Sequence, residues 1–295
     1  PYNTEFGGRV AFFDTDASGC SFTGDRTEFL GRNGSMADPA ALQRERLSGR
    51  LGVGLDPCAA IQVPLSLPDG EASETVFRLG MGKDEDDALY LARRVQGTQR
   101  AHDALDAVRI HWRGLLTSVQ VSTPEPAVDA LVNGWLMYQT LACRYVARSG
   151  YYQSGGAFGF RDQLQDTMAM LHAEPALARE HLLRSAAHQF SQGDVQHWWH
   201  PPQDRGVRTR CSDDYLWLPL AACRYVETTG DGAVMDERAP YLEGRLVNAD
   251  EESYYDLPMR SGQVETIYGH CVRALQRQGG PTHPAAPAAR RCQRC

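Results

Sequence analysis

The chain is short of basic residues, since 30 lysines and arginines stand against 37 aspartates and glutamates, a formal net charge of −7. Nucleic-acid-binding proteins usually carry a basic stripe, so we expect no nucleic-acid partner. The sequence also has no run of 18 apolar residues, which a membrane-spanning helix would need, and no charged and then apolar leader. We therefore expect a cytoplasmic segment that makes no membrane contact of its own.

Paired cysteines are missing too, apart from the terminal CQRC. In a chain of 295 residues, scattered cysteines favour buried reduced thiols over a disulfide framework, and we expect no metal. The motifs GxSxG, GxxxxGK[ST] and GxGxxG do not occur in a fitting context, and we expect no cofactor. The eight cysteines are Cys20, Cys58, Cys143, Cys211, Cys223, Cys271, Cys292 and Cys295.

The composition that remains, 42% hydrophobic and 23% charged, is that of a globular protein with one large or two ordinary domains. Residues 1–90 carry short apolar runs between Gly, Pro, Asn and Asp, which predicts part of a β-sandwich. The acids at 84–87 suit a helix N-terminus, and we assign 91–125 to a helical linker. A helical period dominates 126–276. One helical face there carries Val128, Leu131, Val132, Trp135 and Leu136.

Further helices are predicted within 161–173, 176–190, 213–230 and 264–278. Ten residues, LACRYVARSG at 141–150, return as AACRYVETTG at 221–230, and each copy ends a helix at glycine. An offset of 80 residues fits repeated helical hairpins, although two amphipathic helices could also be alike by chance. The pattern predicts a β-sandwich followed by an α/α barrel.

The stretch GFRDQLQD at 159–166 concentrates groups that bind hydroxyls. Asp162 lies where a helix begins, and Gln165 and Asp166 follow about one turn later. Arg161 adds a planar fork of five donors, and such a set suits the vicinal hydroxyls of a sugar. The alternative is a capping aspartate with a surface ion pair.

A second cluster, within 190–219, contains HWWHPP and RCSDDYLWLP. Trp198 and Trp199 stand in what we predict to be a loop, where paired tryptophans suit a platform for flat sugar faces. His197 and His200 could instead ligate a metal, but no third ligand is spaced to help them. Asp213 and Asp214 precede the next helix, as Asp162 does, and plain N-capping is their alternative role. The loops at these helix starts predict a carbohydrate cleft at the mouth of a helical barrel.

Several motifs together resemble a known family. They are EFGGRVAFF, GDRTEFLGRNGS, LSGRLGVGLDPCAAIQVPLSL, GFRDQLQD, HWWHPP, RCSDDYLWLP and EESYYDLPMRS, in order over residues 1–276. The sequence resembles the inverting sugar phosphorylases of glycoside hydrolase family 94. Within that family it is most similar to the C-terminal phosphorylase-like region of cyclic β-1,2-glucan synthases, which implies a fused glycosyltransferase upstream in the parent protein and an attachment of that parent to the inner membrane.

The resemblance implies a β-sandwich followed by an (α/α)6 barrel, incomplete in this chain, of which 126–276 would form the first part. It also implies phosphorolysis of β-glucosidic bonds with inversion to glucose 1-phosphate. An inverting hydrolase needs two carboxyl groups, but inorganic phosphate, as co-substrate, is already a charged nucleophile. The substrate would be a β-glucan or gluco-oligosaccharide. The residues expected to bind it are Arg161, Asp162, Gln165, Asp166, Trp198, Trp199, His200, Asp213 and Asp214.

The chain departs from the family pattern at its end. The general acid, expected in a GDWND-type motif beyond Arg290, is absent, and so is the later histidine and threonine region that binds phosphate. Residues 277–295 lose the helical period and become rich in Pro, Ala, Arg and Cys. Since the codons of RRCQRC permit Gly-Asp-(Ala or Val)-Asn-Asp one base out of phase, we hypothesise a shifted reading frame near 276–280.

Three functions stay open from the sequence. The first is a phosphorylase-type domain, inactive as this fragment because the acid and the phosphate site are missing. The second is a non-catalytic carbohydrate-binding remnant. The third is an inverting (α/α)6 hydrolase that pairs Asp166 with Asp213 or Asp214.

Overall fold

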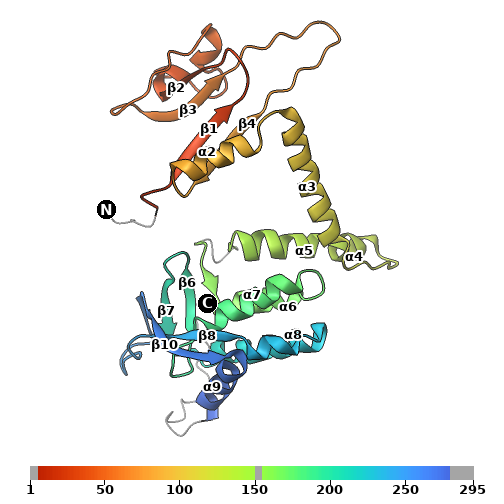
Figure 1. Cartoon of the computed structure of the whole chain (residues 1–295), viewed down its shortest axis with the longest axis vertical. Helices are drawn as coiled ribbons and strands as arrows, with labels where there is room; N and C mark the ends of the chain where they lie inside the picture. Colours follow the sequence, from red (N-terminus) through yellow and green to blue (C-terminus); the bar gives the residue numbers. More distant parts are fainter. Residues whose placement is uncertain (1–5, 150–154, 280–295) are drawn as a thin grey trace. The chain divides into compact units, whose positions relative to one another are not determined.

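The computed structural model describes residues 6–149 and 155–279. The chain divides into two compact units, Pro1–Ile110 and His111–Cys295 (Figure 1). The domain boundaries expected near residues 90, 125 and 276 stay predictions. Within the described residues, no helix combines the length and the hydropathy needed to cross a bilayer.

The first unit is built on two antiparallel strand pairs, as its short apolar runs predict. Strand β1 (Val10–Thr15) pairs with β4 (Phe77–Gly82), and β2 (Ser21–Asp25) pairs with β3 (Pro57–Gln62). The paired residues are 62 to 72 positions apart in β1–β4 and 32 to 41 positions apart in β2–β3, so tertiary contacts set the register. The described strands of this unit therefore form two ribbons.

A small apolar core and a set of hydrogen bonds to Glu28 stabilise the β2–β3 pair. Helix α1 (Arg26–Leu30) places Glu28 where its carboxylate accepts from Thr23 Oγ1 at 2.6 Å and from Ser48 Oγ at 2.7 Å. The Thr23 hydrogen bond is the main reason that the pKa of Glu28 is lowered. The apolar residues of this core are Ala41, Leu47 and Ala60, packed against Phe29 and Cys58.

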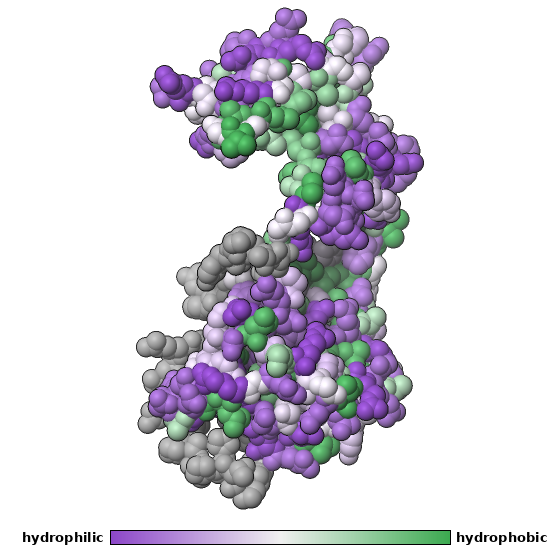
Figure 2. All heavy atoms as spheres, turned by 60° about the vertical axis from the view of Figure 1, so that its left-hand side comes forward, coloured by the Kyte–Doolittle hydropathy of each residue, from purple (hydrophilic) through white to green (hydrophobic). Residues whose placement is uncertain are grey.

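The start of helix α2 follows the predicted pattern of acidic residues. Helix α2 (Glu85–Arg94) begins after Asp84, whose carboxylate accepts from the backbone N–H of Asp87. The predicted acidic helix start is thus confirmed. Helix α3 (Thr98–Leu116) follows and runs past Ile110. Large apolar side chains are exposed on this unit, among them Leu67 and Leu79, and Figure 2 shows apolar surface gathered on it.

The second unit opens with an interrupted helix. Helix α4 (Pro126–Ala130) passes into a π-helical turn (Leu131–Trp135), helix α5 (Leu136–Gln139) and a second π-helical turn (Thr140–Val146). Asn133 and Gly134 leave helical dihedral angles, which breaks the regular helix expected here. Four members of the predicted apolar face are exposed: Val128, Leu131, Trp135 and Leu136.

Four longer helices carry the main core. They are α6 (Phe160–Ala169), α7 (Pro175–Ala186), α8 (Trp217–Thr229) and α9 (Ile267–Gly279), and α6, α7 and α8 contact one another (Figure 1). All four overlap the predicted ranges: α6 and α7 begin one residue earlier, α9 ends one residue later, and 264–266 belong to strand β10. Fully buried Phe160, Leu164, Leu218, Ile267 and Ala274 join the helices into one core. Figure 2 shows only small separate apolar patches on the visible face of this unit.

The stretch predicted to be a tryptophan loop is a β-hairpin. Strand β6 (Gln196–His200) turns into β7 (Arg205–Thr209), and β5 (Phe158–Gly159) and β9 (Ser253–Asp256) complete the order β5-β6-β7-β9. Gly206 permits the close pairing, since a Cβ there would lie 2.1 Å from the Trp198 carbonyl oxygen. The prolines at 201 and 202 indicated a loop, but they occupy only its turn.

A second ribbon lies beside this sheet. Strand β8 (Arg238–Glu243) pairs with β10 (Met259–Thr266), and β8 also contacts α7. In Figure 1 the strands β6, β7, β8 and β10 gather at one end of the helices of this unit. The sheets therefore form a rim at that end.

The 80-residue echo has a structural counterpart. Tyr145 and Tyr225 occupy equivalent positions, and both are buried, as are Leu141 and Ala221. Gly230 ends α8 in the left-handed conformation, with φ of 74°, as predicted. Gly150 lies outside the described residues. A closed ring is not established by helices α5 to α9, so the (α/α)6 barrel stays a prediction.

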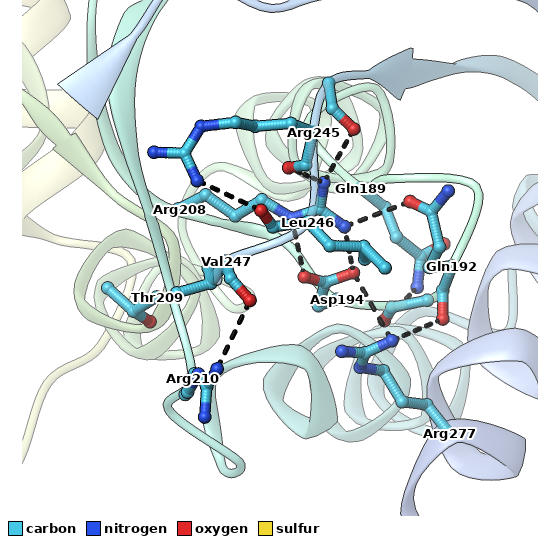
Figure 3. A network of polar contacts seen from close by, with 12 residues as sticks. Gln189, Gln192, Asp194, Arg208, Thr209, Arg210, Arg245, Leu246, Val247 and Arg277 are labelled. Atoms are coloured by element: carbon cyan, nitrogen blue, oxygen red, sulfur yellow. Dashed lines mark hydrogen bonds and ion pairs between the residues drawn. The ribbon is translucent and has the colours of Figure 1, made fainter. Parts of the chain in front are cut away.

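Strand β7 is fixed by a buried arginine. Arg208 is 1% exposed, and its Nε and Nη2 donate to the two carboxylate oxygens of Asp194 at 2.7 and 2.8 Å (Figure 3). Its Nη1 donates to the carbonyls of Gly244 and Arg245, and Nη2 also reaches Gln192. All five guanidinium N–H groups are therefore used.

We expect the substitution Arg208→Met to lower the free energy of unfolding by about 3–5 kcal/mol, because it leaves the Asp194 carboxylate buried without its partner. Urea unfolding followed by tryptophan fluorescence measures the loss. Arg224→Met is the matched control, since that side chain is exposed and its ion-pair partner among the described residues is exposed Glu227, and it should cost less than about 1 kcal/mol. Equal losses in the two variants would contradict the prediction.

Candidate functional site

The site begins where β5 passes into α6. Gly159 is the last residue of β5, opposite Trp198, and it is also the N-cap of α6. Buried Gln163 secures this corner, because its Oε1 accepts from Gly159 N at 2.5 Å and its Nε2 donates to the Arg144 carbonyl at 3.2 Å. A Cβ at position 159 would lie 2.7 Å from Asp162 Oδ2. A larger residue at position 159 would therefore displace the Asp162 side chain, and glycine permits its close approach to the backbone.

Arg161 links two helix starts. Its Nη1 donates to Asp213 Oδ2 at 3.2 Å, and its Nε lies 3.8 Å from Asp162 Oδ1. Burial alone would lower the pKa of Arg161, but the Asp213 hydrogen bond and the charges of Asp162 and Asp213 outweigh it and raise the pKa. The guanidinium is therefore a permanent cation between two partly exposed acids.

Asp166 lies one turn further along α6 and has a different partner. Its Oδ2 accepts from Arg144 Nε at 3.2 Å, and its side chain is 18% exposed. Burial raises the pKa of Asp166 to about 6, and the negative charge of Asp162 adds to this effect, while Arg144 opposes it. This carboxyl therefore changes its charge close to neutral pH.

Asp214 and His197 form a buried acid–imidazole pair. Asp214 is 1% exposed, and its Oδ2 lies 2.7 Å from His197 Nδ1. Burial would lower the pKa of His197, but the hydrogen bond to Asp214 and the charge of Asp214 raise it overall. Among the residues that the structure describes, Asp214 Oδ1 has no hydrogen-bond partner.

Helix capping does not explain the acids. Helix α6 begins at Gly159 without a side-chain cap, and the 3-10 turn Asp214–Leu216 begins at Asp213 without one. In the described part of the chain, the backbone N–H groups at both starts donate no capping hydrogen bond to Asp162 or Asp213, and both carboxylates pair with Arg161. Ion pairing is therefore the observed role of these carboxylates.

The two tryptophans point to opposite sides of strand β6. Trp199 is 1% exposed and lies in the core, with its ring 3.8 Å from the ring of His188. Trp198 is partly exposed and contacts the ring of His200 edge-on at 5.2 Å. Trp199 therefore stabilises the fold, and only Trp198 offers a ring face to a ligand. Gln165 is exposed on α6 beside the site.

His197 and His200, which the sequence suggested as possible metal ligands, have different hydrogen-bond partners. His200 Nε2 contacts the Gly155 carbonyl at 3.1 Å, whereas His197 contacts Asp214. Donor atoms of His197, Cys211 and Asp214 do lie within 4.8 Å of one another, and these are the described side chains that could hold a metal ion. The expected absence of a metal stays a prediction.

Sequence reasoning missed Arg144, Gln163 and the His197–Asp214 pair. Arg144 stands inside the ten-residue echo, at the position that Arg224 occupies in the second copy, and that was its only signal. Gln163 follows the glycine at a helix start by four residues, a spacing from which a side chain can reach back to a free N–H. Of the predicted residues, the structure brings Arg161, Asp162 and Asp213 into contact.

Two family profiles match the sequence. The profile described as "Glycosyl hydrolase 94, supersandwich domain" matches residues 1–98, and "Glycosyl hydrolase 94 superfamily, catalytic domain" matches residues 111–280. Together they cover both units.

Curated relatives agree with the profiles. Cyclic beta-(1,2)-glucan synthase NdvB of Rhizobium meliloti (strain 1021) is 40% identical over 276 residues, 93% of this chain and 10% of that protein. N,N'-diacetylchitobiose phosphorylase of Vibrio proteolyticus is 28% identical over 275 residues, 82% of this chain and 34% of that protein. Solabiose phosphorylase of Paenibacillus borealis is 28% identical over 221 residues, 75% and 27% of the two chains. The chain thus spans between a tenth and a third of the length of these relatives.

We expect Asp166 to give the chain a pH-dependent stability. Between about pH 4 and pH 6 the unfolded chain releases this proton first, so the free energy of unfolding falls as the pH rises. Wild-type protein should lose about 2–3 kcal/mol over this interval relative to Asp166→Asn, at 1.36 kcal/mol per pH unit. Urea unfolding of both proteins at pH 4, 5, 6 and 7 measures the difference. The exposed Asp250→Asn is the control, and an identical slope for all three proteins would contradict the expectation.

Proposed function

The chain belongs to the glycosyl hydrolase 94 superfamily, and from this premise we propose that its second unit binds the non-reducing glucose of a β-glucan or gluco-oligosaccharide. The activity that it serves is phosphorolysis of the β-glucosidic bond with inversion, which releases glucose 1-phosphate. The observation that carries the proposal is the grouping of Arg161, Asp162 and Asp213 at one helix mouth, with Asp166 one turn away.

The cluster suits a sugar because its charges are paired and partly exposed. A diol can donate to the Asp162 and Asp166 carboxylates while it accepts from the Arg161 guanidinium. Each carboxylate already has a cationic neighbour, so a neutral ligand leaves no unpaired charge when it excludes water. An anionic sugar would instead meet four carboxylates, those of Asp162, Asp166, Asp213 and Asp214.

Inorganic phosphate is the proposed co-substrate. One of its oxygens forms a bond to the anomeric carbon from the face opposite the leaving group, the glycosidic C–O bond breaks, and the leaving oxygen takes a proton from a general acid. Arg161, Asp162 and Asp166 hold the ring and take no part in the bond changes. The 295 residues contain no GDWND-type motif to supply the acid, so we expect saccharide binding without turnover from this chain.

The name of the relative that is 40% identical supports a finer proposal, a role in cyclic β-1,2-glucan synthesis. The sugar would then be β-1,2-linked. A hydrolase that uses Asp166 with Asp213 or Asp214 is the alternative. Its main support is the pKa of Asp166 near 6, which is suitable for a general acid. Asp213 and Asp214, however, are already engaged by Arg161 and His197.

We expect Arg161→Met and Asp166→Asn each to weaken the binding of glucose and of β-1,2-linked glucobiose by roughly 10- to 100-fold, since hydrogen bonds to charged groups contribute about 1.5–3 kcal/mol. Isothermal titration calorimetry of the full chain measures the affinities, and Arg224→Met on α8 is the control. Unchanged affinities in both site variants would overturn the proposed site.

Product analysis separates the mechanisms. Incubation of the chain with glucobiose, with and without phosphate, followed by mass spectrometry, should give no glucose 1-phosphate and no free glucose. Glucose 1-phosphate formed only with phosphate would establish phosphorolysis and contradict the expected inactivity. Glucose released without phosphate would favour the hydrolase.

A further inference from the structure

A row of side chains crosses the four-stranded sheet on the side away from the core. Trp198 on β6 is opposite Val207 on β7, and Val207 is opposite Tyr255 on β9. Side chains alternate along a strand, so buried Trp199 and Arg208 mark the core side and the row lies on the other side. The motif GFRDQLQD, which carries the acids, does not predict this row. The row brings together Trp198 and Tyr255, which lie more than 50 residues apart in the sequence.

The two rings of the row form one aromatic surface. The Trp198 and Tyr255 ring centroids lie 5.6 Å apart, and their planes are inclined by 38°. Tyr255 is 52% exposed, so part of its ring is free to contact a ligand. Exposed aromatic surface of this kind often marks a binding site.

Polar groups border this surface. The Arg205 guanidinium lies 5.9 Å from the centre of the Tyr255 ring and 3.9 Å from Asp256, and His200 lies edge-on to Trp198. Flat apolar faces with donors and acceptors at their edges match the two sides of a sugar ring, apolar C–H groups on its faces and hydroxyls around it. A nucleic acid is disfavoured by the negative net charge of the chain.

The aromatic surface begins on the side of the sheet where Asp162 lies. A Cβ on Gly159 would point to the same side as Trp198, and it would lie 2.7 Å from Asp162 Oδ2. Gly159, opposite Trp198, is followed by one residue and then by Arg161 and Asp162. From Trp198 the row extends across two further strands, a distance of about 10 Å. A saccharide whose terminal ring lies at the acids therefore has this surface next to it.

We propose that Trp198 and Tyr255 form a stacking subsite for a further glucose unit of the same glucan, with Arg205 binding its hydroxyls. This subsite rests on the proposed glucose site at Arg161 and Asp166. It makes the chain select oligosaccharides over glucose, because only a longer ligand covers both rings.

The test compares glucose with β-1,2-linked glucotriose by calorimetry on the full chain. Tyr255→Thr, which keeps a strand-forming residue, should weaken glucotriose binding roughly tenfold, equivalent to about 1.4 kcal/mol, and change glucose binding by less than about twofold. Tyr255→Leu keeps apolar bulk without the flat ring and should behave in the same way. The control is Tyr268→Ala, an exposed tyrosine on α9.

The outcomes separate the two proposals. Loss of glucotriose affinity alone supports the subsite. Unchanged glucotriose affinity in both Tyr255 variants overturns the subsite but leaves the glucose site intact, provided that Arg161→Met still weakens glucose binding. Equal loss for both sugars also overturns the subsite, since it indicates a general effect on the fold. If wild-type protein binds neither sugar, both proposals fail.

Discussion

The second unit depends on one buried charge pair. Removing Arg208 and Asp194 from water is costly, and the cost is offset here because the carboxylate receives a bidentate bond and the remaining guanidinium N–H groups find carbonyl or amide oxygens. The guanidinium also lies 3.7 Å from the centre of the Phe190 ring. These contacts join β7 to the turn before β6 and to the segment after β8 (Figure 3). The position of the β6–β7 hairpin, which carries His197 and Trp198, is thereby fixed within the second unit.

Much of the helical architecture could be predicted from sequence because its signals are local. The acidic residues at 84–87 mark the start of α2. The segments of α6 to α9 each carry an apolar pattern long enough to predict a helix. The hairpin could not be predicted in the same way. Its prolines and histidines are loop-like residues, and only pairing with β5 and β9, about 40 and 50 residues away, makes them strands.

Only the part of the candidate site that lies within one helix could be predicted from the sequence. Arg161, Asp162 and Asp166 share one helix, so their proximity follows from helical spacing. The partners of Asp166 and Arg161 come from elsewhere: Arg144 lies in the preceding π-helical turn, and Asp213 comes directly before the 3-10 turn that leads into α8. Composition cannot reveal which of two adjacent aspartates is buried. Here Asp213 is exposed and Asp214 is buried, and this difference decides which of them pairs with a histidine.

Gly159 belongs to both a strand and a helix start, and this has a mechanical consequence. Backbone pairing with Trp198 fixes one side of the residue, and the packing of Asp162 fixes the other. The main chain therefore sets the spacing between the Cα atoms of Trp198 and of the first residues of α6. Backbone pairing at Gly159 thus acts as a rigid spacer, and under the proposed function it would favour saccharides whose consecutive units match this spacing.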